Sequence, residues 1–415
     1  MRKKVYFKTF GCRTNLYDSQ VMMSSLKDYD ITQNEAEADL IVVNSCTVTN
    51  GADTHVRSYI GHVEKTSDAK IFLTGCGAHT KGEKLLQEKR VQGVFGQSEK
   101  QNIDKLLSKE QPFYELGDLN HIDDMVVDDF VGKSRAFIKI QEGCDFRCSY
   151  CIIPYVRGDA RSMSEERILE QIRRLAANGF GEFILTGTNV GSYGHKVGTS
   201  IAKLMKKISL IRGVRRIRVG SVEPVQIGDE FKEILGEPWL EKHLHIALQH
   251  TSPKMLKYMS RRNVYNQDKE LFEFLSSKGF AIGTDFITGH PGESEELWQE
   301  AMKNAAELPL THIHSFTYSK RDGTVSAHMK PEVNGKVAKA RLHELNALIK
   351  DKNYDFRKNF SGELEVLIES YKDGLYHGFD QHFNKIVINS NDDLVGNWMN
   401  ITDYEVKGDY NYAKL

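Results

Sequence analysis

Six cysteines, all within the first 151 residues, are the feature that most constrains this chain of 415 residues. They form a dispersed trio and a tight trio: Cys12, Cys46 and Cys76, then Cys144, Cys148 and Cys151. A disulfide scaffold is not expected, because such scaffolds are typical of short secreted chains, whereas this length predicts two or three domains. The positions of the cysteines, more than their even number, therefore carry the information.

The composition is that of an ordinary globular protein, with 40% hydrophobic and 27% charged residues. No apolar run approaches the length that is needed to span a bilayer. The basic residues Met1–Lys4 are followed by alternating polar and apolar residues, whereas a signal peptide would continue with an unbroken apolar stretch. We therefore expect a cytoplasmic protein that does not contact a membrane.

The first hundred residues alternate strand patterns with helix patterns, which favours a parallel sheet with helices on its faces. The candidate strands are Lys4–Thr9, Asp39–Asn44 and Lys70–Thr74. Each of Cys12, Cys46 and Cys76 lies just past the C-terminal end of one of these strands. The carboxyl ends of neighbouring parallel strands line one crevice, so the dispersed trio is expected to converge in space. A lone buried cysteine is usually inert, but three at equivalent positions favour a shared ligand.

A second series of strands and helices begins after residue 134 and predicts a partial barrel of six βα units, with its chemistry at the C-terminal strand ends. Its candidate strands are Phe137–Ile140, Glu182–Thr186, Arg215–Ser221, His243–Leu248, Ile282–Thr288 and His312–Thr317. Residues 336–358 read as an amphipathic helix, and alternation after Gly362 predicts a small antiparallel β unit. The expected α/β organisation is an N-terminal domain over 1–117, a linker over 118–133, a barrel over 134–358 and a β domain over 359–415.

The tight trio has the spacing CxxxCxxC and follows the first barrel strand. Three thiolates on one short loop can hold three irons of a cubane cluster and leave the fourth iron open to another ligand. The alternative is structural zinc, which needs four ligands in a closed site. The nearest histidines, His121 and His195, lack the spacing of a zinc finger, so the cluster is favoured.

A CxxxCxxC loop after the first strand of a βα barrel resembles the radical S-adenosylmethionine (SAM) superfamily. The resemblance implies a 4Fe–4S cluster whose open iron binds the amino and carboxyl groups of SAM, and cleavage of SAM to a 5′-deoxyadenosyl radical. It also implies that Tyr150, the aromatic residue before the last cysteine, packs near the adenine. The protein then orients the cofactor and excludes side reactions.

The contexts of the other cysteines narrow the resemblance to the methylthiotransferases, over nearly the whole chain. The matching segments are Thr9–Asn15, Asn44–Asn50, Leu73–Cys76, Phe137–Cys144, Cys151–Gly158 and Tyr318–Thr324. The resemblance implies that Cys12, Cys46 and Cys76 hold an auxiliary 4Fe–4S cluster, that its open iron carries the transferred sulfur, and that one SAM methylates this sulfur while another supplies the radical. The last β unit is similar to the TRAM domain of the family.

Residues next to the first two cysteines distinguish the subfamilies. The sequences Cys12–Asn15 and Cys46–Asn50 look like those of the type that adds a methylthio group to C2 of N6-threonylcarbamoyladenosine at tRNA position 37. The segment Gln249–Ser252 departs from that type, because its Gln-His pair is more like the type that modifies a ribosomal-protein side chain. Two alternatives therefore stay open: the ribosomal-protein enzyme, and a non-catalytic RNA-binding protein with structural zinc.

Several strand-end residues resemble the SAM contacts of the superfamily. They are Gly187, Asn189, Glu223, Gln249 and Gly289, in addition to Tyr150. The alternative for such residues is a backbone role, because Asn, Ser and Gly favour turns in any loop. His290, next to Gly289, is expected as a polar surface residue or a catalytic one.

The net charge of −1 gives no general support for nucleic-acid binding. Residues 361–415 carry four Lys, no Arg and ten Asp or Glu, so an RNA-binding surface is expected before residue 361. Arg212, Arg215, Arg216 and Arg218 could contact phosphates or form a solvated edge. The expected partners are the anticodon stem-loop of tRNA, an external electron donor and a sulfur donor.

Overall fold

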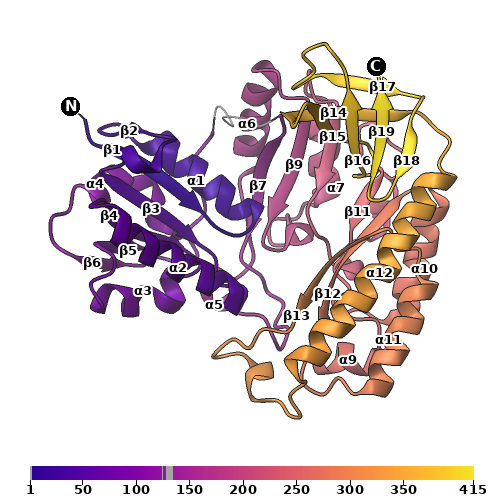
Figure 1. Cartoon of the computed structure of the whole chain (residues 1–415), viewed down its shortest axis with the longest axis horizontal. Helices are drawn as coiled ribbons and strands as arrows, with labels where there is room; N and C mark the ends of the chain where they lie inside the picture. The colour runs from indigo at the N-terminus through magenta and orange to yellow at the C-terminus, as the bar shows by residue number, and fades with distance from the viewer. Residues whose placement is uncertain (1, 124, 128–133) are drawn as a thin grey trace.

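The computed structural model describes residues 2–123, 125–127 and 134–415, and its N-terminal part is a six-stranded parallel sheet in the order β2-β1-β3-β4-β5-β6. Helices cover both faces of this sheet (Figure 1). The elements are β1 Lys4–Thr9, α1 Arg13–Ser25, β2 Asp30–Ile31, β3 Leu40–Ser45, α2 Asn50–Thr66, β4 Lys70–Gly75, α3 Ala78–Gln87, β5 Gly93–Phe95, α4 Ile103–Leu107 and β6 Phe113–Glu115. Strand β3 is buried along its whole length, as its continuous apolar run requires in a sheet covered on both sides.

The central part is an open barrel that is built from two parallel strand groups. One group runs β10-β9-β7 with the short antiparallel β8 at its edge, and the other runs β11-β12-β13. Isolated parallel bridges, Ile217 to Leu240 and Val222 to Ile246, join the two groups. The strands are β7 Ala136–Glu142, β8 Arg161–Ser162, β9 Glu182–Gly187, β10 Arg216–Val219, β11 His243–His245, β12 Ala281–Thr288 and β13 His312–Thr317.

Helices surround the outside of the barrel, and the long α12 runs beside β13 (Figure 1). They are α6 Glu165–Ala177, α7 Ile201–Ser209, α8 Asp229–Lys232, α9 Pro253–Tyr258, α10 Tyr265–Ser277, α11 Glu295–Glu307 and α12 Gly335–Asn359. The short α5 Ile153–Arg157 lies instead at the junction with the N-terminal sheet, where Val156 packs with Cys76. Leu345 and Ile349 of α12 are buried in the barrel core, which confirms the amphipathic helix. The mixed α/β architecture with six parallel barrel strands is the one that the sequence predicts.

A buried network of ion pairs joins the N-terminal sheet to the barrel. Its members, called the interdomain ion network below, are Asp18, Lys100, Asp123, Lys139, Glu142 and Arg157, with side chains no more than 5% exposed. Asp18 of α1 accepts hydrogen bonds from Lys100, at 2.9 Å, and from Lys139 of β7, at 2.6 Å. Removing one member would leave an uncompensated buried charge, so the network fixes the N-terminal sheet against the barrel.

The C-terminal part is a curled sheet in the order β17-β14-β15-β16-β19-β18. Its strands are β14 Leu364–Lys372, β15 Leu375–Phe379, β16 Lys385–Asn389, β17 Trp398–Ile401, β18 Glu405–Lys407 and β19 Tyr410–Lys414. The pairs are antiparallel as predicted, except that β16 pairs with β19 in parallel. Arg357 of α12 donates hydrogen bonds to the carbonyls of Lys407 and Tyr410, which ties this sheet to the barrel helices.

The predicted linker falls partly outside the described residues, which omit 124 and 128–133. Within the described part, Asp123 belongs to the interdomain ion network and Val127 is completely buried in the barrel core. This stretch therefore packs as part of the domain junction. No helix within the described ranges is long and apolar enough to cross a membrane.

Candidate active site

Cys12, Cys46 and Cys76 lie at the carboxyl ends of β1, β3 and β4, which are adjacent in the sheet. The register pairs Thr9 with Asn44 and Ser45 with Gly75, so the three strands end side by side. All three cysteines line one cavity of about 680 Å³, whose other wall is formed by strand ends of the barrel. A volume of this size is typical of a site for a small molecule or a single nucleoside.

The surroundings of the dispersed trio act on its thiols. The pKa of Cys76 is raised to about 11, chiefly by burial and also by the neighbouring Cys12 and Cys46, while Arg157 opposes the rise. Nε of Arg157 donates a hydrogen bond to Sγ of Cys76 over 3.1 Å. Burial also raises the pKa of Cys46. Three mutually interacting thiols beside a fixed cation suit a metal cluster that bears negative charge.

The tight trio occupies the loop between β7 and α5. Gly143 has φ +73°, and a Cβ there would lie 2.0 Å from the carbonyl oxygen of Asp159, so the loop needs glycine at that position. The N–H of Cys144 donates to the carbonyl of Gly158, which closes the loop. Sγ of Cys144 accepts from Nδ2 of Asn189 at 3.4 Å. Asn189 follows β9 and is buried, so the predicted site residue contacts a cysteine of the tight trio.

Glu223, a second predicted site residue, is joined to the same loop through Arg261. The guanidinium of Arg261 forms an ion pair with Glu223 and approaches Sγ of Cys148 at 3.5 Å. Burial raises the pKa of Cys151 to about 12, while the N–H of Ile153 lowers it. The tight trio thus has donors directed at two of its sulfurs, which is the chemistry that stabilises metal-bound thiolates. Both trios therefore fit an iron–sulfur cluster as the resident group.

The remaining predicted SAM contacts differ in position. Gly187 lines the cavity, where a Cβ would crowd Gln141, and the ring of Tyr150 packs edge-to-face on His290 at 6.3 Å. Gln249 has φ +68°, and it forms an isolated parallel bridge with Phe286 of β12. Gly289 has φ +75° and packs against Ala338 of α12. The structure therefore brings Asn189 and Glu223 to the tight trio, and it gives Gln249 and Gly289 backbone roles in the barrel wall.

His290 is neither a surface residue nor a cavity residue. It is completely buried, and its Nε2 lies 2.7 Å from Oγ of Ser326. Ser326 in turn donates to Oγ of Ser149, between two cysteines of the tight trio. Burial lowers the pKa of His290 to about 4, so the ring is neutral at pH 7. The expectation of a polar surface histidine was wrong, because this ring supports the cysteine loop from behind.

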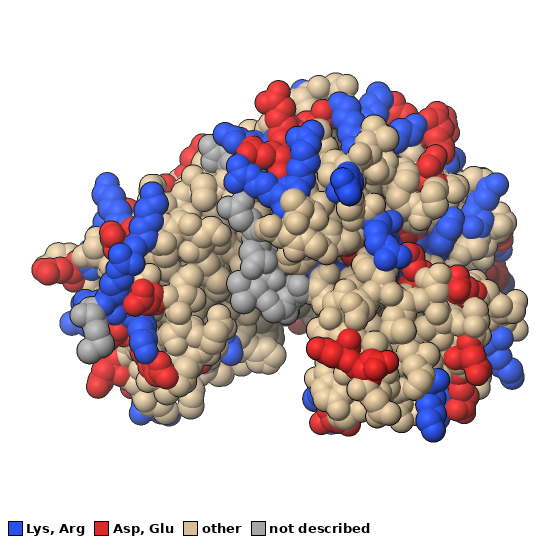
Figure 2. Space-filling model, turned by 90° about the horizontal axis from the view of Figure 1, so that it is seen from above, with Lys and Arg blue, Asp and Glu red and all other residues tan. Residues whose placement is uncertain are grey.

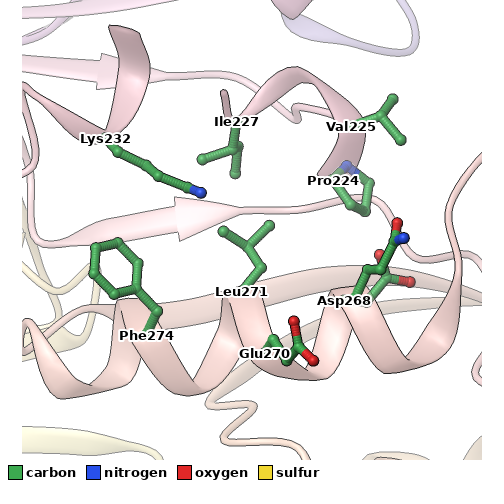
Figure 3. Close-up of a pocket in the computed structure, with 9 residues that line it drawn as sticks. Pro224, Val225, Ile227, Lys232, Asp268, Glu270, Leu271 and Phe274 are labelled. Atoms are coloured by element: carbon green, nitrogen blue, oxygen red, sulfur yellow. The ribbon is translucent and has the colours of Figure 1, made fainter. Parts of the chain in front are cut away.

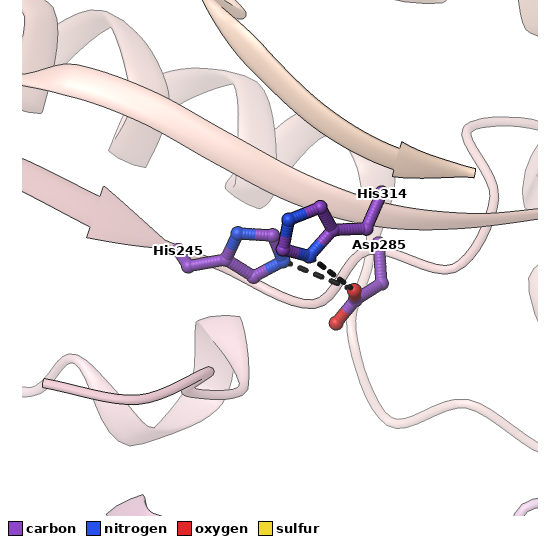
Figure 4. A group of neighbouring side chains, drawn as sticks. All are labelled: His245, Asp285 and His314. Carbon is purple, nitrogen blue, oxygen red and sulfur yellow. Dashed lines mark ion pairs between the residues drawn. The ribbon is translucent and has the colours of Figure 1, made fainter. Parts of the chain in front are cut away.

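A group of histidines in the barrel interior was not predicted. His245, Asp285 and His314 come from the three neighbouring strands β11, β12 and β13 and point toward one another (Figure 4). Nε2 of His245 lies 3.1 Å from Oδ1 of Asp285, and Nδ1 of His314 lies 3.7 Å from the same oxygen. These three residues also line the cavity. His245, Asp285 and His314 form a polar part of the cavity wall, with a ligand set that could also hold a cation.

His250, the residue behind the Gln-His departure, does not reach the cavity. It is completely buried, its Nδ1 accepts from the N–H of Ser252, and its Nε2 lies 3.4 Å from Glu293. Its ring packs on Phe286 at 4.8 Å. The Gln-His pair therefore lies in the packing behind β12 and not in the lining of the cavity.

The arginines at the start of β10 differ in whether their side chains are buried or exposed. Arg216 and Arg218 are buried and form ion pairs with Glu182, and Arg218 also pairs with Glu241. They are not available to RNA, so the expectation of a basic edge at these two positions was wrong. Arg215 is exposed and stacks on Trp398 of the C-terminal sheet at 4.5 Å. On the face of the molecule that is seen from above in Figure 2, basic and acidic side chains are interspersed.

A smaller cavity of about 330 Å³ lies between α10 and the turn that follows β10 (Figure 3). Pro224, Val225, Ile227, Leu271 and Phe274 form its apolar part. No cysteine or histidine lines it among the described residues. It lacks the groups that the larger cavity offers, so the larger cavity is the candidate active site.

Residues 4–96 match the family described as "Uncharacterized protein family UPF0004", and residues 138–305 match the radical SAM superfamily. The "Putative methylthiotransferase" of Helicobacter pylori strain J99 is 52% identical over 99% of both chains. The "Threonylcarbamoyladenosine tRNA methylthiotransferase MtaB" of Bacillus subtilis is 31% identical over 99% of this chain and 96% of its own. This chain belongs to the radical SAM methylthiotransferase family, and its type is that of MtaB. It is therefore an enzyme that transfers a sulfur group, and the family implies SAM and a 4Fe–4S cluster as cofactors.

Among solved structures, the radical SAM methyltransferase TsrM of Kitasatospora setae matches with a TM-score of 0.61. The match covers 79% of this chain and 77% of TsrM at 14% identity, so it supports the fold alone. Because the family is enzymatic, the alternative of a non-catalytic zinc protein is set aside. The two family matches and the relatives at 52% and 31% identity confirm the methylthiotransferase resemblance that the cysteine contexts indicate.

Proposed function

We propose that this methylthiotransferase modifies tRNA, and that it adds a methylthio group to C2 of N6-threonylcarbamoyladenosine at position 37. The observation that carries the proposal is the cavity itself, in which three cysteines of the N-terminal sheet face the interior of the barrel. A single nucleoside that leaves the anticodon loop would fit such a closed site better than a duplex would. The relatives named for this substrate, at 31% to 33% identity, support the same choice.

The two cysteine trios take separate roles in this proposal. Cys144, Cys148 and Cys151 hold the 4Fe–4S cluster that binds SAM, and Cys12, Cys46 and Cys76 hold an auxiliary 4Fe–4S cluster. When bound, these groups supply the radical, the methyl group and the sulfur. Tyr150, Gly187, Asn189, Glu223, Gln249 and Gly289 contribute to the SAM site through side chains or backbone. The proposed reaction consumes both electrons and sulfur, so an external electron donor and a sulfur donor are further partners.

The protein residues act by orienting and enclosing the substrate. The interdomain ion network fixes the distance between the two cysteine trios, and the strand ends of the barrel exclude water from the reacting base. The C-terminal sheet, in the role of a TRAM-like domain over 359–415, packs on the amino ends of the barrel strands, where Arg135 pairs with Glu369 and Arg216 donates to the carbonyl of Glu365, and it contacts the anticodon stem-loop. The domains over 1–117 and 134–358 then hold one cluster each, with 118–133 between them, in a cytoplasmic enzyme.

Deleting the gene and analysing the nucleosides of bulk tRNA by mass spectrometry tests this proposal. The expected result is that 2-methylthio-N6-threonylcarbamoyladenosine disappears while its unthiolated precursor accumulates. Restoring the gene should return the modification, whereas a gene that carries Cys76→Ala should not. Loss of methylthiolation on a dimethylallyladenosine instead would assign the enzyme to that other tRNA substrate. An unchanged nucleoside profile would contradict the tRNA proposal.

A further inference from the structure

Arg13 stands apart from every other charged residue in the wall of the cavity. It directly follows Cys12 and opens helix α1, and its guanidinium lies 5.9 Å from the ring of Phe137 on β7. Within the described part of the chain, Arg13 has no ion pair and no hydrogen bond to a carboxylate. Its side chain is half-buried and lines the same cavity as the three cysteines.

The other cations of the cavity are already matched by carboxylates. Arg157 pairs with Asp18 and Glu142, and Arg218 pairs with Glu182 and Glu241. Each of these buried guanidiniums is thus held by two carboxylates, and Arg157 also donates to Sγ of Cys76.

The histidines of the cavity do not supply a free positive charge either. His245 and His314 share the carboxylate of Asp285. Burial lowers the pKa of His312 to about 3 and that of His243 well below its ordinary value, so both rings are neutral at pH 7. Arg13 is thus the cavity cation, among the described residues, whose charge has no partner.

The environment of Arg13 favours an anion. Burial lowers the pKa of its guanidinium and the cations Arg135 and Arg218 lower it further, while Glu241 raises it. An arginine side chain nevertheless stays protonated in proteins, so the charge persists in a partly desolvated position. A ligand carboxylate would restore the lost interactions, and the planar fork of the guanidinium suits both of its oxygens.

We propose that Arg13 binds the carboxylate of the threonylcarbamoyl group and thereby selects this nucleoside over adenosines that lack the acid. The inference rests on the proposed function, because it concerns the same cavity and substrate. A backbone phosphate of tRNA is the competing anion, but a phosphate follows the outside of the loop, whereas Arg13 lies in the wall of the cavity beside Phe137. The carboxylate belongs to the nucleoside that must enter it.

Synthetic anticodon stem-loops with either N6-threonylcarbamoyladenosine or its methyl ester at position 37 test this role. The ester removes the negative charge of the acid and leaves every phosphate in place. The enzymes are the reconstituted wild type, Arg13→Gln, Arg13→Lys, and Arg173→Gln as a matched control on the exposed surface of α6. Iron content is measured for each, because Arg13 adjoins Cys12.

We expect the wild type and Arg173→Gln to prefer the acid over the ester by roughly tenfold to a hundredfold in kcat/KM. Arg13→Gln should lose that factor on the acid and nothing further on the ester, and Arg13→Lys should keep part of the preference. Equal losses of Arg13→Gln on both stem-loops, or an undiminished preference for the acid, would overturn the assignment.

Binding of the same stem-loops to the reconstituted proteins in the absence of SAM separates this inference from the proposed function. A preference for the acid that depends on Arg13 should also be visible in Kd, without turnover. If the wild type methylthiolates neither stem-loop, the proposed function fails, and the Kd comparison still decides whether Arg13 binds the carboxylate. If Kd is also the same for acid and ester, the Arg13 inference fails as well.

Discussion

Nε of Arg157 donates a hydrogen bond to Sγ of Cys76 over 3.1 Å, so a residue of the barrel is bonded directly to a cysteine of the N-terminal sheet. The same guanidinium pairs with Asp18 on α1. One side chain therefore links the interdomain ion network to the dispersed cysteine trio. The position of that trio relative to the barrel depends on a contact that is both electrostatic and buried.

The first prediction concerns Arg157. Arg157→Met should lower the free energy of unfolding by about 3 to 5 kcal/mol, because it leaves the buried carboxylates of Asp18 and Glu142 without this partner. Arg90→Met is the matched control, since Arg90 pairs with Glu64 at the surface and should cost no more than about 1 kcal/mol. Urea unfolding of the cluster-free proteins measures both, and similar costs for the two variants would refute the role of Arg157.

The two cysteine trios should bind iron independently. Alanine at Cys12, Cys46 and Cys76 together should halve the iron content from roughly eight to about four per chain and leave reductive cleavage of SAM intact. Alanine at Cys144, Cys148 and Cys151 should remove the same amount of iron and abolish SAM cleavage. Iron analysis and the yield of 5′-deoxyadenosine check both. Loss of SAM cleavage in the first variant, with the second trio still loaded, would contradict separate roles.

Gly289 should tolerate no side chain. Gly289→Ala forces a φ of +75° on a non-glycine residue and places its Cβ 2.4 Å from Cβ of Ala338. The expected loss of unfolding free energy is about 2 to 4 kcal/mol, as backbone strain and overpacking add. Gly279→Ala has a similar φ of +80° in open space and should lose only about 1 kcal/mol. Equal losses would show that the contact with α12 yields without cost.

Stability should fall as the pH drops below about 6.5, in part because of His382. Burial lowers the pKa of this histidine to about 4, and the nearby cations Lys242 and Arg218 contribute. The folded protein therefore favours the neutral ring. The resulting stability is present above the unfolded pKa of 6.5 and is lost as the pH falls through 4, by about 3 kcal/mol at most.

His382→Gln should flatten the dependence of unfolding free energy on pH between 6.5 and 4. The measurement is urea unfolding of the cluster-free wild type and variant across this range. The difference between the two curves isolates His382 from other groups that titrate. Parallel curves would mean that the ring can be protonated in the folded protein without cost.

The sequence predicted the strands and the convergence of the dispersed cysteines well. Lys4–Thr9 and His312–Thr317 are strands with the predicted bounds, because short β-branched runs between turns leave little choice. Cys12, Cys46 and Cys76 were placed correctly at one sheet edge, since parallel strands share their carboxyl ends. Local patterns are sufficient for such features.

Features that depend on distant partners were missed. His243 and His245, like His312 and His314, are spaced by two residues, and this spacing could have indicated one inward face of each strand. The same spacing at Arg216 and Arg218 does not reveal which face is buried, and their partner Glu182 is more than thirty residues away. Arg157 likewise finds Asp18 at a separation of 139 residues, which no local pattern encodes.

The most direct test of the account uses the purified enzyme with both clusters reconstituted, SAM, a reductant and a sulfide source. The substrate is an anticodon stem-loop that carries N6-threonylcarbamoyladenosine at position 37, and mass spectrometry of the digested nucleosides reports the product. The account predicts 2-methylthio-N6-threonylcarbamoyladenosine, and no such product when Cys12, Cys46 and Cys76 are replaced by alanine. A fully loaded enzyme that cleaves SAM yet leaves this nucleoside unchanged, while it modifies a different nucleoside or a protein, would contradict the account.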